Sequence, residues 1–345
     1  MDIYSLIRFY QRIKSPKVKL LGILVLHLLR RRYLNMVFDP SLACNLRCRM
    51  CYFSDPETRK FLHGTFTEED IEAIARSLFH RVLRLQIGCG AEPTTFKSLP
   101  LLVKRAHEQG IPHISITTNG QLLTPELLNE LAANGLNELT ISAHGMSKEV
   151  YEAMMPHASH ERFLQTADSI SQLKAQYPQL KIRLNYTINR DNIDDLQLMP
   201  QMLERLKADT LQLRPIQQIG DSDYDIFSMD EIAAKYDDRI VPIINYCQQK
   251  GITCLYPERE NLVIIEQEHQ QKDEHYDNNA VDMLPYFQLS PHEGWKEKID
   301  PYSETFEDYC RRTHRIRFIL KCLVGINSHQ QEEGTTKALN YNIKS

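Results

Sequence analysis

Between residue 35 and about residue 258, short apolar and β-branched runs alternate with stretches of helical periodicity. This alternation is typical of βα units, in which helices join the successive parallel strands of one sheet. Strands are expected at residues 35–39, 82–88, 113–117, 138–142, 181–188, 210–215 and 252–255. Helices are expected at residues 68–80, 99–109, 125–133, 160–177, 196–207 and 229–250. Six or seven such units predict an α/β fold, a partial (βα)6 TIM-like barrel, because a full eight-unit barrel would need more strands.

Several helix ends carry signals of their own. Thr67 precedes three acidic residues and an apolar-periodic stretch, which is the pattern of a helix N-cap. Gly110 and Gly251 each follow a polar helix end and precede a strand, as C-terminal glycines do. In βα barrels the active site lies at the carboxyl ends of the strands, so we expect any functional site of this chain at that edge of the sheet.

The composition is that of an ordinary globular protein, with 42% hydrophobic and 25% charged residues in a chain of 345. The formal net charge of −4 gives no global reason to expect a nucleic-acid partner. That charge is unevenly distributed. Residues 1–32 contain eight Lys and Arg and one acid, a net of +7, which leaves −11 for the remainder.

The basic N-terminal segment also has an apolar character. One helical stripe is expected to contain Ile3, Leu6, Ile7, Tyr10 and Ile13. A second apolar helix is expected at Leu20–Leu29, a run too short to span a bilayer, which needs about 20 residues. Two interpretations stay open: helices that lie on an anionic membrane surface, and helices that pack against the barrel. Binding to RNA phosphates is disfavoured by the acidic remainder of the chain.

Three cysteines follow the first expected strand, Cys44, Cys48 and Cys51, with the spacing C-x3-C-x2-C. Soft thiolates favour zinc or an iron–sulfur cluster over hard cations. A cubane cluster usually takes four thiolates, so three from one loop would leave one iron open to a ligand. Zinc would need a fourth ligand, and the nearest histidine, His63, lies twelve residues after Cys51. A disulfide is disfavoured because the loop holds three cysteines, an odd number, and because the rest of the chain has a non-secreted character.

The second expected strand ends in Gly88-Cys89-Gly90-Ala91-Glu92-Pro93. Two nearby glycines after a strand suggest a dinucleotide loop, but Pro93 stands where the third glycine is needed. Residues without bulk let a ligand approach the backbone, and a carboxylate can accept from a cation. The missing third glycine therefore argues against a dinucleotide loop.

With its cysteine loop and its Gly-Ala-Glu-Pro run, the chain resembles the radical S-adenosylmethionine (radical SAM) superfamily. The resemblance implies a [4Fe-4S] cluster whose open iron is chelated by S-adenosylmethionine. It also implies reductive cleavage of that cosubstrate to a 5′-deoxyadenosyl radical, which takes hydrogen from a substrate, and a reductant such as flavodoxin or ferredoxin. In that family the protein supplies binding, orientation and exclusion of water. The metal ligands would be Cys44, Cys48 and Cys51.

The resemblance extends to individual cosubstrate-binding positions. Gly90, Ala91 and Glu92 match the Gly-Gly-Glu motif that holds the ammonium, with Ala91 in place of the second glycine. Ser142, which ends the fourth strand, matches a serine that contacts the methionyl carboxylate or the ribose. Met50 occupies a position that is often aromatic and packs on adenine, a contact that a thioether can also make.

Two further positions are expected from the order of the strands. Asn185, on the fifth strand, would reach the ribose, and Arg214, on the sixth, would pair with the carboxylate, which a guanidinium matches bidentately. His144, beside Ser142, would contact substrate or cap its loop, and both roles stay open. Thr117–Gly120 is expected to shape the pocket at the end of the third strand.

We divide the chain into a basic, apolar helical segment (1–34), a radical SAM core barrel (35–258) and a partly irregular C-terminal extension or lid (259–345). Five cysteines lie outside the cluster loop, and we expect packing roles rather than a second cluster for them, because they lack a C-x2-C pair: Cys89, Cys247, Cys254, Cys310 and Cys322.

The exposed thiolate loop favours a location in the reducing cytoplasm. The basic, apolar residues 1–32 additionally suggest contact with a membrane surface. The alternative function is a non-catalytic iron–sulfur or zinc-binding regulatory module. The sequence does not indicate a substrate: a peptide, a lipid-linked sugar, a small metabolite and an RNA base all stay open.

Overall fold

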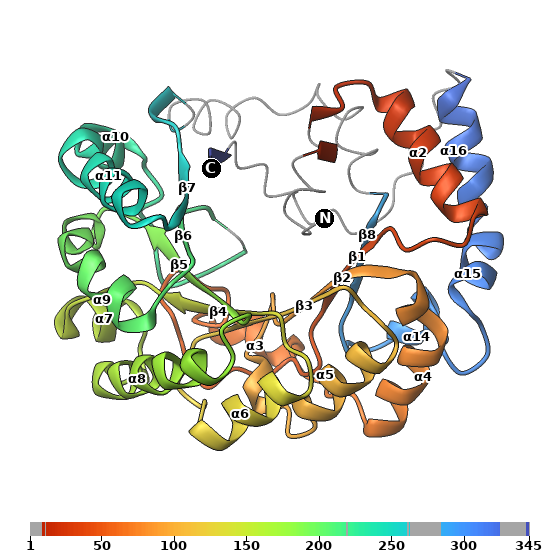
Figure 1. Ribbon diagram of the computed structural model, residues 1–345, viewed down its shortest axis with the longest axis horizontal. Helices are drawn as coiled ribbons and strands as arrows, with labels where there is room; N and C mark the ends of the chain where they lie inside the picture. Colours follow the sequence, from red (N-terminus) through yellow and green to blue (C-terminus); the bar gives the residue numbers. More distant parts are fainter. Residues whose placement is uncertain are drawn as a thin grey trace.

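The computed structural model describes residues 9–10, 12–218, 220–260, 262, 284–324 and 343–344. Its centre is a curved sheet of nine strands in the order β8-β1-β2-β3-β4-β5-β6-β7-β9 (Figure 1). The strands are β1 (Leu34–Phe38), β2 (Val82–Ile87), β3 (His113–Thr118), β4 (Glu138–Ala143), β5 (Lys181–Ile188), β6 (Thr210–Pro215), β7 (Thr253–Pro257), β8 (Tyr286–Leu289) and β9 (Ile343–Lys344).

Eight of these strands are parallel. Strands β1 to β7 pair in sequence order, and β8 adds to the free edge of β1 in the same direction. The short strand β9 is antiparallel to β7. The sheet is open between β8 and β9 in the part of the chain that the structure describes, and this is the partial barrel expected from the βα alternation.

The described helices are α2 (Pro16–Leu28), α3 (Pro56–Phe61), α4 (Glu68–Leu78), α5 (Leu99–Glu108), α6 (Pro125–Ala133), α7 (Lys148–Met154), α8 (His160–Gln176), α9 (Met199–Leu206), α10 (Asp230–Ala234), α11 (Val241–Lys250), α14 (Trp295–Lys298), α15 (Phe306–Arg312) and α16 (Arg315–Leu323). Helices such as α4, α5, α6 and α8 cover the outer, convex side of the sheet (Figure 1). Thr67 caps α4 as expected: it accepts from Asp70 N at 3.1 Å, and its own N–H donates to Asp70 Oδ2 at 2.8 Å. Gly251 ends α11 with φ +69°, also as expected.

The alternation of side chains along the strands separates an apolar outer core from a polar interior. In β2, Leu85 and Ile87 are fully buried under the helices, while the alternating residues Arg84 and Gln86 are only half-buried. Buried polar residues recur on neighbouring strands, including Glu138 on β4 and Arg183 on β5, which pair at 3.1 Å. The barrel interior is therefore built to face water and polar ligands.

Helix α2, near the start of the chain, packs against helix α16, which lies far later in the sequence. Helix α2 buries Leu20, Ile23 and Leu24, and it lies beside α16 (Figure 1). Arg81, which has no exposed surface, approaches Glu307 of α15 at 3.4 Å and donates to the carbonyl oxygen of His27 at 3.0 Å. Of the two interpretations of this segment, packing against the rest of the protein is observed for one side of α2. Most of the first expected stripe lies outside the described residues.

The expected strands β1 to β7 are all present, with ends that shift by two residues at most. Strand β8 was not expected, because the segment around it has no clear period. No described helix is long and apolar enough to cross a membrane.

Candidate functional site

The three candidate cluster cysteines lie in the loop that joins β1 to α3, at the carboxyl edge of the sheet. Backbone hydrogen bonds tie this loop to the end of α7. Arg47 N donates to Pro156 O, and Arg49 N donates to Met154 O, both at 3.1 Å. The guanidinium of Arg47 also donates to two carbonyl oxygens of its own loop, at 2.7 and 2.8 Å. The loop is thereby held in place independently of any bound metal.

The thiols of Cys44, Cys48 and Cys51 are free and half-buried. Burial raises the pKa of each, that of Cys44 to about 11, and the thiols of Cys44 and Cys51 raise the pKa of Cys48 further. Leu46 N–H faces the Cys44 sulfur at 3.4 Å. Bound iron would supply the positive charge that stabilises the thiolates.

No three His, Cys, Asp or Glu side chains in the described residues are grouped around a position for a single metal ion. In a cubane cluster each thiolate binds a different iron, so its ligands stand farther apart than those of one ion. Three free thiols on one anchored loop, close enough to affect each other's ionisation, therefore fit such a cluster.

The loop after β2 is held by two residues of the β1 side. Asp39 accepts from the N–H groups of Cys89 at 2.8 Å and Gly90 at 3.0 Å, and the Tyr52 hydroxyl donates to the Gly90 carbonyl oxygen. Burial raises the pKa of the Asp39 carboxyl, and these N–H groups oppose that effect. A Cβ at Gly90 would lie 2.9 Å from Tyr52 Oη and 3.1 Å from Asp39 Oδ2, so a larger residue there would have to displace one of these two side chains.

Glu92 joins this loop to the end of β3. Its side chain is 3% exposed and accepts from Thr118 Oγ1 at 2.6 Å, Asn119 N at 2.8 Å and Thr94 N at 3.1 Å. Asn119 in turn donates to Asn45 Oδ1 of the cysteine loop at 2.9 Å. Burial raises the pKa of Glu92, whereas the four donor groups that face the carboxylate lower it. The cysteine loop, the Gly-Ala-Glu-Pro run and the Thr-Asn-Gly turn thus form one hydrogen-bonded unit.

The other predicted residues lie on β4, β5 and β6. Ser142 and Asn185 are register partners on neighbouring strands, and Asn185 Oδ1 is buried without a hydrogen-bond partner in the described part of the chain. Burial lowers the pKa of His144 to about 4, and the nearby guanidinium of Arg214 adds to this effect. His144 is therefore neutral at pH 7.

Cys89 lies near charged groups from both sides of the barrel. It is open to solvent, yet surrounding protein and Asp39 raise its pKa, while the guanidinium groups of Arg214 and Arg84 lower it. Residues of β1, β2 and β6 therefore gather around one solvent-accessible position. Such a position lies on the wall of an open interior, not in a packed core.

Met50 extends from the cysteine loop toward the end of β5. Its sulfur accepts from Asn189 Nδ2 at 2.8 Å, and Asn189 is fully buried. The neighbouring Asn192 donates to the carbonyl oxygens of His144 at 3.0 Å and Thr187 at 2.8 Å. Met50 is therefore positioned by a polar turn that also fixes the loop after β4.

Asp39 and Tyr52 contact the predicted site residues but were not singled out from the sequence, whereas Asn119 belongs to the Thr117–Gly120 run that was expected to shape the pocket. Asp39 comes directly after a strand and Tyr52 directly after the last cluster cysteine, and these two positions were the available signals. Of the remaining cysteines, Cys247 and Cys254 are buried and hydrogen-bonded to each other. Cys310 is buried as well.

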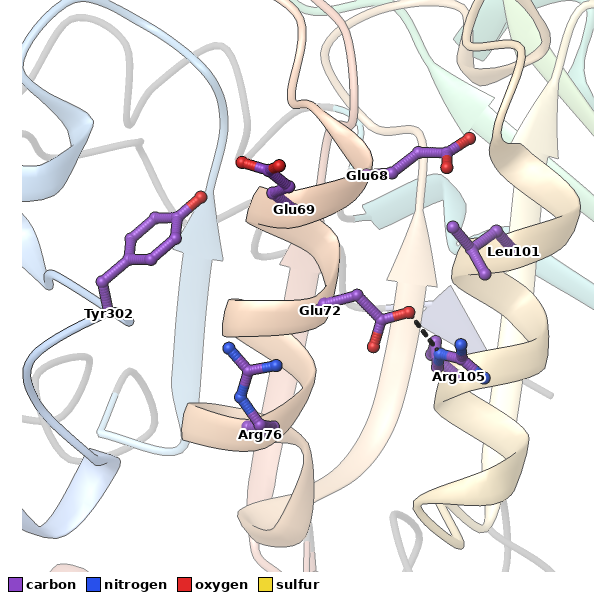
Figure 2. A pocket seen from close by; sticks show the side chains of 7 residues that line it. All are labelled: Glu68, Glu69, Glu72, Arg76, Leu101, Arg105 and Tyr302. Carbon is purple, nitrogen blue, oxygen red and sulfur yellow. Dashed lines mark hydrogen bonds and ion pairs between the residues drawn. The ribbon is translucent and has the colours of Figure 1, made fainter.

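An open pocket of about 510 Å³ lies elsewhere, on the outer surface between α4 and α5 (Figure 2). Two of the acidic residues that line it have partners: Glu72 pairs with Arg105 at 2.6 Å, and Glu68 accepts from Ser98 Oγ at 2.6 Å. It shares no lining residue with the hydrogen-bonded unit at the barrel edge.

The open parallel barrel carries three free thiols on one loop at its carboxyl edge. These features are those of an α/β protein that binds a metal cluster. Comparison with known families makes this specific: residues 39–207 match the model of the Radical SAM superfamily, to which the chain belongs. The matched region begins at Asp39 and includes the cysteine loop, the Gly-Ala-Glu-Pro run, Ser142 and Asn185. Membership implies a [4Fe-4S] cluster and S-adenosylmethionine as cofactors.

The chain is similar to a "Probable GTP 3′,8-cyclase" of Saccharolobus solfataricus, with 23% identity over 61% of this chain and 63% of the relative. It is also similar to one of Thermoplasma volcanium, with 28% identity over 50% of each chain. The chain thus spans less than two thirds of these curated relatives.

Among solved structures, Streptococcus suis SuiB bound to precursor peptide SuiA matches with a TM-score of 0.53 and 17% identity, over 75% of this chain and 57% of that one. The structure titled "Native anSMEcpe with bound AdoMet" matches with a TM-score of 0.50 and 15% identity, over 64% of this chain and 63% of that one. These likenesses establish the shared fold.

Proposed function

We propose that the protein is an S-adenosylmethionine-cleaving radical enzyme. When bound, the reduced cluster supplies the electron that breaks the carbon–sulfur bond of the cosubstrate, giving methionine and a 5′-deoxyadenosyl radical that takes hydrogen from a substrate. The observation that carries the proposal is the hydrogen-bonded unit in which Asn45 of the cysteine loop meets Asn119, and Asn119 meets Glu92. A module that only stores or senses iron has no need for this link.

The roles of individual residues follow from their positions. Cys44, Cys48 and Cys51 would hold three irons, and the anchored loop would leave the fourth to the cosubstrate. Gly90, Ala91 and Glu92 would bind the ammonium group of S-adenosylmethionine, since Tyr52 and Asp39 already orient this stretch of backbone.

On the other side of the barrel, Ser142, Asn185 and Arg214 would contact the ribose and carboxylate. Asn185 Oδ1 is buried without a partner among the described residues, and a bound hydroxyl would satisfy it. Met50, positioned by Asn189, would pack against the adenine.

The proposal is tested by anaerobic reconstitution followed by reduction. The wild-type chain should bind one [4Fe-4S] cluster and convert S-adenosylmethionine to 5′-deoxyadenosine. Cys48→Ala should lose both the cluster spectrum and the product, whereas Cys322→Ala, a half-buried cysteine of α16, should keep both. Bound zinc, or a cluster without any 5′-deoxyadenosine, would instead support the non-catalytic module.

We further propose a flavodoxin or ferredoxin as the reductant, since enzymes of this superfamily need an electron donor. We also propose a cytoplasmic location with peripheral membrane contact through residues 1–32. Reduction by purified flavodoxin, measured as 5′-deoxyadenosine formed without dithionite, tests the first of these proposals.

A further inference from the structure

Helix α2 is apolar on two sides. Its inner side buries Leu20, Ile23 and Leu24 against the protein. Its outer side exposes six aliphatic residues, with exposed fractions from 38% to 64%: Val18, Leu21, Val25, Leu26, Leu28 and Leu29. An exposed apolar stripe along almost a whole helix is unusual on a protein that meets only water, and such patches mark interaction sites.

Helix α16 adds to this surface. It lies beside α2 (Figure 1), and it exposes Leu320 (48%) and the following Val324 (71%). The two helices run in opposite directions, because Arg315 at the start of α16 is close to His27 at the end of α2. The aliphatic surface is therefore made from two segments far apart in the sequence. We name these residues, from 18 to 29 and from 320 to 324, the two-helix surface.

The charges along the two helices are mostly basic. Residues 12–32 contain seven Lys and Arg and no acid. Residues 309–324 contain five Lys and Arg and no acid, and two of these five pair with acids that precede the segment: Arg311 with Asp308 and Arg312 with Glu304, both at 2.7 Å. Lys14, Lys17, Arg30 and Arg31, at the two ends of α2, are exposed and form no ion pair with any described residue. The rest of the chain must then be acidic, because the whole molecule carries −4.

We propose that the two-helix surface docks on an anionic lipid bilayer, with the aliphatic side chains in the interfacial layer and the basic side chains on lipid phosphates and carboxylates. With 13 residues, α2 is about 20 Å long and cannot span a hydrocarbon core of about 30 Å, so it lies in the membrane plane. This surface adds α16 to the contact proposed for residues 1–32 and does not depend on radical chemistry.

Two other occupants fit less well. A second copy of the chain would bring the same basic residues against each other, and like charges oppose such an interface. Single-stranded nucleic acid is bound by aromatic side chains on which bases stack, whereas the exposed apolar side chains of the two helices are aliphatic. An anionic bilayer satisfies both the aliphatic and the basic residues.

The experiment is sedimentation of the cluster-loaded, full-length protein with vesicles of phosphatidylcholine, with and without phosphatidylserine. The wild type should pellet with the anionic vesicles only. Leu21→Gln with Val25→Gln should weaken partitioning about tenfold, because two exposed aliphatic side chains no longer leave water. The matched control Leu122→Gln changes a leucine that is 41% exposed in the loop after β3, away from α2 and α16, and should leave vesicle binding unchanged.

The charges are tested separately. Arg30→Gln with Arg31→Gln should weaken binding to anionic vesicles about 30-fold, since each of the two basic residues near such a surface contributes about 1 kcal/mol. Lys97→Gln with Lys104→Gln removes two exposed charges elsewhere and should change nothing.

Equal pelleting of wild type and variants, or no pelleting at all, overturns the proposal. A wild-type dimer that the Leu21 and Val25 changes convert to monomers, measured by light scattering, would assign the surface to a second copy. Cleavage of S-adenosylmethionine is measured without vesicles, so it can succeed or fail independently of docking.

Discussion

The carboxyl edge of the barrel has two arcs that are built differently. On the β1–β3 arc, formed by the loops after β1, β2 and β3, the site residues are hydrogen-bonded to one another. Asp39 accepts from Gly90 N, Glu92 accepts from Asn119 N, and Asn119 Nδ2 donates to Asn45 Oδ1. On the β4–β6 arc, polar groups end in the open interior, and Asn185 Oδ1 and His144 Nδ1 are buried without a partner among the described residues.

This difference indicates which part of the site is formed before ligands bind. A buried polar atom without a partner costs about 1–3 kcal/mol, so a set of them on one arc is expected to find partners in a ligand or in ordered water. On the β1–β3 arc, Asp39 Oδ2 and Arg84 Nε are also buried without a hydrogen-bond partner among the described residues, but the other oxygen of the Asp39 carboxylate already accepts from two N–H groups. We infer that the β1–β3 arc is preorganised and that the β4–β6 arc is completed by its ligand.

The largest effect is expected at Glu92. Glu92→Gln places an NH2 group among four donors, so the link between the loops after β2 and β3 should break. We expect a loss of about 2 kcal/mol in the free energy of unfolding and about 100-fold in 5′-deoxyadenosine formation. Glu69→Gln, at an exposed acid of α4, is the control. Wild-type stability in Glu92→Gln would mean that the β1–β3 arc is not preorganised by this carboxylate.

A smaller loss is expected at Asp39, which orients Gly90 without belonging to the family motif. Asp39→Ala removes the acceptor of the Cys89 and Gly90 N–H groups and should raise the KM for S-adenosylmethionine about tenfold, with a lesser change in kcat. Asp39→Asn keeps one oxygen in place and should recover most of the affinity. If both variants behave alike, charge rather than the position of the loop explains the effect.

The opposite arc should respond in the opposite way. Asn185→Leu replaces a side chain whose Oδ1 has no partner with an apolar one of similar size, so the ligand-free protein should keep its stability or gain about 1 kcal/mol. The same change should weaken S-adenosylmethionine binding about tenfold, measured by equilibrium dialysis. A ligand-free protein that is destabilised as strongly as Glu92→Gln would remove the distinction between the arcs.

The β1–β3 arc is also where the sequence was most informative. The spacing of Cys44, Cys48 and Cys51 and the run Gly90–Glu92 are local patterns, and the seven core strands follow from local periodicity. Asp39 and Tyr52 were missed because their roles depend on contacts across 38 to 51 residues of chain. Strand β8 was missed for a similar reason: four residues pair with β1 from a segment without a period of its own.

The smallest effect concerns pH and the β4–β6 arc. Burial, with Arg214 as a second cause, lowers the pKa of His144 from 6.5 to about 4 in the folded protein. The unfolded chain therefore binds a proton that the folded chain excludes, and His144 makes the protein less stable as the pH falls from about 6.5 toward about 4. Between about pH 7.5 and about pH 5.5, the wild type should lose about 1 kcal/mol more unfolding free energy than His144→Gln, which cannot titrate. Urea unfolding of both proteins at the two pH values measures this difference. Equal losses would show that the imidazole accepts its proton without cost, and that the interior beside Arg214 is already open to water in the ligand-free protein.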